Sequence, residues 1–174
     1  AFVREMYPKL LKYHKWWYAK RDHDKNHICE FGSVDGTLVA AAWESGMDNA
    51  IRFDGTKMVQ NGPDAWSTDQ ESVDLNAYLS LEYTLLKKFA ALLDEPFLLP
   101  DYRSMVADYF FDKKDGFFYD RRMNATRDFV REAGCEGYIP FWANIATKEQ
   151  FAKARKLLDN KKKFSTYIPF PTIA

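Results

Sequence analysis

The chain has 174 residues, 47% of them hydrophobic, and its 25 Lys and Arg residues balance 25 Asp and Glu residues to a formal net charge of +0. This composition fits one buried core and excludes intrinsic disorder, and the zero net charge gives no reason to expect a nucleic-acid or anionic-membrane partner. The apolar run Val39–Trp43 is far too short to span a bilayer, so a soluble protein is expected. Cys29 and Cys135 predict isolated thiols rather than a disulfide framework.

The first element is predicted to be an amphipathic helix over residues 2–20. Apolar side chains such as Leu10 and Trp17 recur there at the 3.6-residue period of a helix. Trp16 and Trp17 are adjacent, and adjacent helical residues cannot both face one way. We therefore expect one indole in the core and the other directed elsewhere.

Residues 22–30 alternate oxygen-bearing side chains with other residues. In an extended backbone this alternation places the oxygen donors on one side, and hard oxygen donors suit Ca²⁺. The candidate ligands are Asp22, Asp24, Asn26, the Ile28 carbonyl and Glu30. An EF-hand is excluded, because His27 replaces its glycine and Ser33 its bidentate glutamate. A solvated polar loop explains the same pattern, and both interpretations stay open.

Residues 43–49, with the sequence WESGMDN, are the stretch where we expect the chemistry. Large apolar neighbours such as Trp43 and Met47 would raise the pKa of the Asp48 carboxyl, which suits a general acid. The Trp43 ring offers a flat face and an N–H group that suit a sugar. Gly46 permits a backbone turn beside an approaching ligand.

A second interpretation of Asp48 is structural. Asp48 precedes residues 49–53, a plausible first helical turn, and could be the N-cap that accepts its backbone N–H bonds. On this interpretation the chain is a non-catalytic helical scaffold or a carbohydrate-binding module.

The later elements are also predicted to be mainly helical. Residues 54–64 are predicted to form a long irregular crossing, and either Ser67 with Gln70 or Thr68 with Glu71 to make a capping box. Apolar periodicity then predicts helices over 73–93, after Pro100, and over 147–158, the last capped by Thr147 and Gln150. Residues 117–120 and 128–130 predict two small strands around a loop, a short β-hairpin.

Three strings resemble glycoside hydrolase family 63: ESGMDN at 44–49, QESVDLNAY at 70–78 and GCEGYIPFW at 134–142. They stand in the family's order and spacing, and the similarity covers nearly the whole chain. The resemblance implies an (α/α)6 toroid that needs far more chain than this. We therefore expect residues 1–174 to be part of one catalytic domain, whose remainder is a partner, in a bacterial cytoplasm or periplasm.

The resemblance also implies a reaction, inverting exo-acting hydrolysis of an α-glycosidic bond as in α-glucosidases. Asp48 would be the general acid, while the family's base is a downstream glutamate that nothing after Ala146 matches. The substrate-binding residues would be Trp43, Glu44, Met47, Asn49, Arg52 and Glu136. Glu71 would complete the calcium shell.

The substrate stays open among a glucoside, mannosylglycerate and another small α-glycoside. Residues 49–53 read NAIRF, where the family more often has Asn-Ser-Pro-Arg-Trp. Trehalase is less expected, since its other signature strings are absent.

Overall fold

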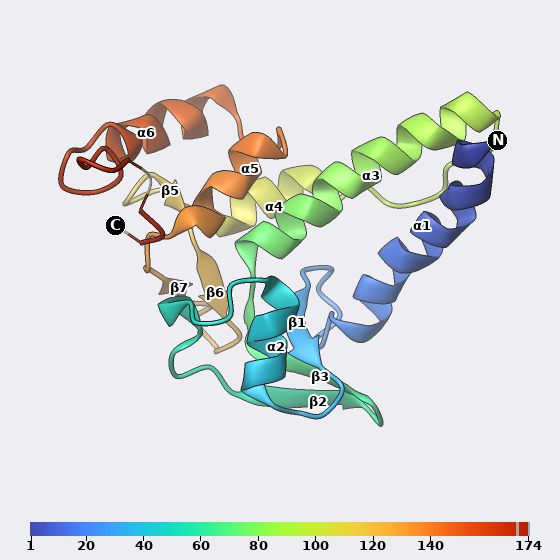
Figure 1. Ribbon diagram of the computed structural model, residues 1–174, viewed down its shortest axis with the longest axis horizontal. Helices are drawn as coiled ribbons and strands as arrows, with labels where there is room; N and C mark the ends of the chain where they lie inside the picture. The colour runs from blue at the N-terminus through green and yellow to red at the C-terminus, as the bar shows by residue number, and fades with distance from the viewer. Residues whose placement is uncertain (170, 174) are drawn as a thin grey trace.

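Two long helices that run in opposite directions dominate the computed structural model, which describes residues 1–169 and 171–173 (Figure 1). They are α1 (Phe2–Lys20) and α3 (Val73–Leu93). Tyr7 of α1 packs against Leu86 and Ala90 of α3, and these three side chains are buried. The helices diverge from this contact, and a small sheet lies beyond their other ends (Figure 1).

Helix α1 confirms the predicted amphipathic helix. Trp17 is 7% exposed and meets Phe31 edge to face, whereas Trp16 is 37% exposed. One indole therefore packs in the core and the other faces outward, as the spacing requires.

The sheet is antiparallel throughout its described pairs, with strand order β1-β3-β6-β7 and β2 beside β3. Its strands are β1 (Glu30–Ser33), β2 (Met58–Gly62), β3 (Ala65–Glu71), β6 (Asp120–Arg122) and β7 (Phe129–Val130). Strands β6 and β7 form a hairpin, as predicted, and a second pair, β4 (Phe111–Asp112) with β5 (Phe117–Phe118), precedes them. The first strand of the hairpin is 120–122 and not 117–120, because Phe117 and Phe118 pair with β4 instead.

Strands β2 and β3 overturn two predictions. Residues 54–64 are not one long irregular crossing, and the proposed capping box is wrong because its residues lie in β3. Ser67 pairs with Gly32 of β1 and accepts a hydrogen bond from Asn61, while Thr68 donates to the Phe31 carbonyl. The two hydroxyls thus form hydrogen bonds with neighbouring strands of the sheet. Ser72 is the N-cap residue of α3, but its side chain makes no capping hydrogen bond.

The remaining helices are α2 (Leu38–Ser45), the 3₁₀ turn η1 (Ile51–Phe53), α4 (Arg103–Phe110), the 3₁₀ turn η2 (Cys135–Tyr138), α5 (Ile139–Trp142) and α6 (Lys148–Leu158). Among them, α4 and α6 were predicted from the sequence, whereas α2, η2 and α5 were not. Helix α3 ends at Leu93, as predicted, and its C-cap Asp94 has the left-handed conformation, φ 58°. Thr147 and Gln150 form the predicted capping box of α6. The fold is therefore mainly helical with antiparallel sheets.

Two apolar clusters meet at the start of α3 and position the site. One contains Trp17, Phe31 and Phe53, and the other contains Val73 and Phe110. Side chains of this size each contribute about 1.5–3 kcal/mol when fully buried. The start of α3 is therefore a fixed point of the molecule.

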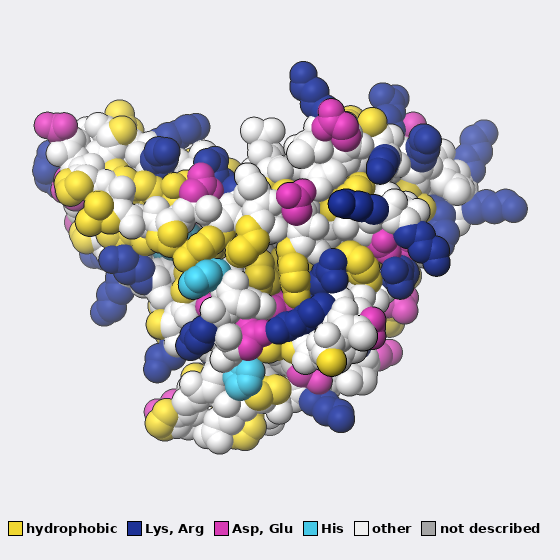
Figure 2. Space-filling model, turned by 180° about the vertical axis from the view of Figure 1, so that it is seen from behind, with side chains coloured by type: hydrophobic (Ala, Val, Ile, Leu, Met, Phe, Trp, Pro, Cys, Tyr) yellow, Lys and Arg dark blue, Asp and Glu magenta, His cyan; other side chains and the backbone are white. Residues whose placement is uncertain are grey.

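None of the described helices is long and apolar enough to cross a bilayer. Seen from behind, Lys and Arg side chains project around the end that carries α6, and hydrophobic side chains form a band across the middle (Figure 2). Cys29 and Cys135 are free thiols, as predicted.

Candidate active site

A cavity of about 390 Å³ lies beside the loop that follows α2. Gly46 ends the helix in the left-handed conformation, φ 73°, which a residue with a side chain rarely adopts. Residues 46–52 then line the cavity together with Glu136 and residues 172–173. The size is that of a small-molecule site.

Asp48 lies on the wall of this cavity with an exposed side chain. The 3₁₀ turn that follows has Ala50 as its N-cap and no side-chain cap, so Asp48 does not cap it. This finding contradicts the structural interpretation of Asp48. Trp43 is 63% exposed, so it does not enclose the carboxylate as we expected from the sequence.

The other predicted substrate contacts divide into two groups. Met47, Asn49, Arg52 and Glu136 line the cavity together with Asp48. Trp43 and Glu44, by contrast, are not among its described lining residues.

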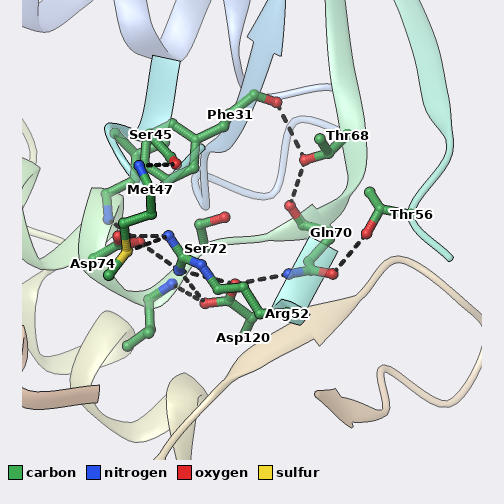
Figure 3. Close-up of polar contacts among 12 residues, drawn as sticks. Phe31, Ser45, Met47, Arg52, Thr56, Thr68, Gln70, Ser72, Asp74 and Asp120 are labelled. Carbon is green, nitrogen blue, oxygen red and sulfur yellow. Dashed lines mark hydrogen bonds and ion pairs between the residues drawn. The ribbon is translucent and has the colours of Figure 1, made fainter. Parts of the chain in front are cut away.

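Arg52, which lines the cavity, is also the centre of a buried polar cluster (Figure 3). Its Nη1 and Nη2 donate to the two carboxylate oxygens of Asp74 at 3.0 and 2.8 Å, and Nη1 also donates to Asp120 at 3.1 Å. Nη2 reaches the Met47 Sδ at 3.4 Å. We call Arg52, Asp74 and Asp120 the Arg52 cluster. Their side chains are 1–3% exposed, so the ion pairs are shielded from water.

Asp120 is a member of this cluster that the sequence reasoning missed. Its carboxylate also accepts the Val73 N–H at 2.7 Å and Gln70 Nε2 at 2.8 Å. Gln70 in turn accepts the Thr56 hydroxyl at 3.0 Å. A lone acid directly after the aromatic run at 117–119 was the only sequence signal for it.

Glu136 reaches the cavity from η2 and is 6% exposed. Burial raises its pKa to about 7, although the nearby positive charge of Arg52 acts in the opposite direction. A Cβ atom on Gly134 would lie 2.2 Å from the Glu136 Oε2, so a side chain there would displace the Glu136 carboxyl group. The cavity therefore contains a carboxyl group that changes charge near neutral pH.

Glu44 is held by groups outside the cavity. Its carboxylate accepts Nε and Nη2 of the buried Arg21 and also the Gly32 N–H at 2.7 Å. A Cβ atom on Gly32 would stand 2.0 Å from the Trp66 carbonyl oxygen, which only glycine avoids. Glu44 thus ties α2 to β1 and to the end of α1.

The acidic loop brings part of the predicted calcium set together. Asp22, Asp24 and Glu30 each place a carboxylate oxygen within 4.8 Å of the others. Glu30 is fully buried, and its Oε1 has no hydrogen-bond partner among the described residues. Burial also raises the pKa of Glu30 and of Asp22. Hard carboxylate oxygens with one unsatisfied buried atom fit Ca²⁺.

The other predicted ligands make contacts of their own. Glu71 accepts hydrogen bonds from Asn26 at 2.6 Å, from Arg127 at 3.0 Å and from the Tyr109 hydroxyl. The Asn26 Oδ1 accepts the Ile28 N–H at 2.8 Å. Asn26 also donates from its Nδ2 to the Asp24 carboxylate at 3.3 Å, so Asn26 joins the carboxylate of Glu71 to that of Asp24, while the Ile28 carbonyl stays a predicted ligand.

Comparisons with known proteins agree with the motifs. The family model described as the mannosylglycerate hydrolase MGH1-like glycoside hydrolase domain matches residues 1–174. A curated mannosylglycerate hydrolase of Thermus thermophilus is 33% identical over 93 residues, which are 47% of this chain and 20% of that protein.

Solved structures share the fold at lower identity. A Thermus thermophilus GH63 mannosylglycerate hydrolase in complex with glucose has a TM-score of 0.70 at 18% identity, covering 98% of this chain and 48% of that one. The same enzyme with Tris and D-glycerate gives 0.71 at 16%, covering 98% and 51%. The chain thus spans about half the length of these structures. Because the family model matches it from end to end, the chain belongs to the mannosylglycerate hydrolase MGH1-like family of glycoside hydrolases.

Proposed function

We propose that this chain forms one wall of an active site that hydrolyses an α-glycosidic bond with inversion, and that Asp48 is its general acid. One observation carries the proposal: the family's acid motif presents Asp48 on the wall of a cavity of about 390 Å³. Membership of a glycoside hydrolase family supports the reaction class. The exposed position of Asp48 leaves it accessible to a leaving-group oxygen.

The reaction needs two carboxyl groups with different tasks. Asp48 would protonate the glycosidic oxygen as the bond to the anomeric carbon breaks, while a carboxylate base would activate water on the opposite face of the sugar. We propose that this base comes from the remainder of an (α/α)6 toroid. The structural neighbours, about twice as long as this chain, support that division.

The same cavity would bind the sugar. Arg52 is one of its lining residues, and Met47 and Asn49 flank Asp48 in the chain. Glu136, with its pKa at about 7, can donate a hydrogen bond to a sugar hydroxyl when protonated. Trp43 and Glu44 would contact a ligand only where it extends past the described cavity.

We infer that a small α-glycoside such as mannosylglycerate is the substrate to test first. The name of the curated relative supports this choice. An α-glucoside is the comparison, because NAIRF at 49–53 departs from the commoner family continuation.

A structural calcium ion is the remaining part of the proposal. Asp22, Asp24 and Glu30 would hold it, and the unsatisfied Glu30 oxygen supports this assignment. The ion would fix the loop between α1 and β1, and no catalytic step passes through it.

The test is Asp48→Asn in the full-length protein, assayed with mannosylglycerate and with an α-glucoside. We expect loss of turnover with folding unchanged by circular dichroism, because asparagine keeps the shape but carries no transferable proton. Asp54→Asn is the matched control, an exposed aspartate outside the described cavity lining, and it should retain turnover. Release of the β-anomer, followed by proton NMR, would support inversion. Full turnover by Asp48→Asn would reject Asp48 as the acid.

A further inference from the structure

The carboxylate of Asp48 is not anchored directly. No described residue hydrogen-bonds to it, and the side chain is exposed. Its position therefore depends on the backbone of residues 46–53. Whatever holds that backbone also sets the distance from the acid to a bound sugar.

Arg52 connects two points of this loop. Met47 precedes Asp48 and meets the Arg52 Nη2 through its Sδ, while Arg52 follows Asp48 by four residues. The Ala50 N–H donates to the Met47 carbonyl at 3.0 Å, which closes the turn between them. Phe53, only 4% exposed, fixes the far end of the loop in the core.

The orientation of Arg52 depends in turn on two carboxylates. Asp74 takes both terminal nitrogens in a fork, which fixes the guanidinium plane. Asp120 takes Nη1 from a second direction, so that Nη1 is fully engaged and Nη2 is left for Met47 (Figure 3). Rotation of the guanidinium would break contacts to both acids.

Asp120 itself is fixed by the scaffold. Strand β6 places it where the Val73 N–H, at the first turn of α3, and the Gln70 amide of β3 both donate to its carboxylate. Its side chain is 1% exposed. Asp120 therefore fixes Arg52 relative to the sheet and to α3, although it is not among the described lining residues of the cavity.

We propose that Asp120 is a positioning residue of this site, which acts through Arg52 to hold residues 46–53 and thereby sets the position of Asp48. The part of this inference that concerns catalysis rests on the proposed function. The part that concerns the loop does not.

Hydrogen exchange at the backbone amides of Ala50 and Phe53, measured in the full-length protein, tests directly how firmly the loop is held. Asp120→Asn keeps the size of the side chain and removes its charge, and exchange at both amides should become at least about tenfold faster. Asp112→Asn is the matched control, since Asp112 is a buried carboxylate paired with Arg131 at 2.8 Å in β4. The control should leave both amides unchanged.

Two further single variants and one double variant distinguish a specific loosening of the loop from a general loss of stability. Met47→Leu removes the sulfur contact without leaving a buried charge, and it should also speed exchange at Ala50. Arg52→Lys should act like Asp120→Asn, and the double variant should add nothing, because Asp120 works through Arg52. Unchanged exchange in Asp120→Asn, or additive effects in the double variant, would overturn the proposal.

Kinetics separate this inference from the proposed function. If Asp48 is the acid, Asp120→Asn should lower kcat by about 10²-fold with little change in KM, as expected for a small misplacement of a catalytic group. If Asp48→Asn keeps full turnover while Asp120→Asn still loosens the loop, the acid assignment fails and the positioning role stands. If the loop loosens and kcat holds in an enzyme that does depend on Asp48, the catalytic part of the inference is wrong.

Discussion

Arg21 holds the carboxylate of Glu44 between two nitrogens, Nε at 2.9 Å and Nη2 at 2.7 Å. Its side chain is 3% exposed and that of Glu44 is 22% exposed. The guanidinium also lies over the Trp16 ring, 4.9 Å from its centroid. This ion pair joins the end of α1 to the last turn of α2, directly before the loop that carries Asp48.

Replacing Glu44 by glutamine should therefore destabilise the fold. The change leaves the buried Arg21 charge without its carboxylate partner, which we expect to cost about 2–4 kcal/mol of unfolding free energy, less than for a fully buried pair. Urea unfolding measures this loss. Glu5→Gln breaks the exposed pair with Lys9 and should change stability very little. Equal stability of the two variants would contradict the structural role of Glu44.

The elevated pKa of Glu136 predicts a specific dependence of stability on pH. Between its usual value of 4.5 and about 7, folded Glu136 keeps a proton that the unfolded chain has released. Its stabilising contribution is thus complete below about pH 4.5 and is lost as the pH rises through about 7. Glu136→Gln should reduce the stability difference between about pH 5 and pH 8 by roughly 2–3 kcal/mol.

Urea unfolding at both pH values tests this expectation. Glu132→Gln is the matched control, because it removes an exposed glutamate four residues away and should leave the pH dependence as it is. An identical pH profile in wild type and Glu136→Gln would show that Glu136 ionises freely in the folded protein.

Calcium should raise the melting temperature if the acidic loop binds it. An excess of a hundredfold over Kd stabilises a folded protein by about 2.7 kcal/mol, and EDTA should reverse the shift. Asp24→Asn removes one of the three carboxylates and should weaken the response. Asp64→Asn, at an exposed turn, should respond like wild type. A melting temperature indifferent to calcium and EDTA would count against the ion.

The long helices could be predicted from the sequence because their signal is local. Helices α1 and α3 bury one stripe each, and a stripe repeats every 3.6 residues whatever it packs against. The strand β3 could not be predicted in the same way. Ser67 to Glu71 satisfy a capping pattern as well as a strand, and the deciding partner of Ser67 is Gly32, 35 residues earlier.

The candidate site, too, could be predicted only where its signal is local in the sequence. The motif at 44–49 indicates where Asp48 lies, since neighbouring residues in sequence share one loop. Asp120 could not be assigned, because its role arises only when β6 brings it against Arg52 and the start of α3. The enclosure of Asp48 by Trp43 was also expected wrongly, since α2 directs that indole outward.

Gly32 is a marker by which distant members of this family can be recognised. Any side chain there would strike the Trp66 carbonyl, and the same residue donates its N–H to Glu44. Homologues that retain the pairing of Arg21 with Glu44 should therefore be invariant at this glycine. An alignment anchored on Gly32 would follow the lineage even where the neighbouring acid motif has diverged.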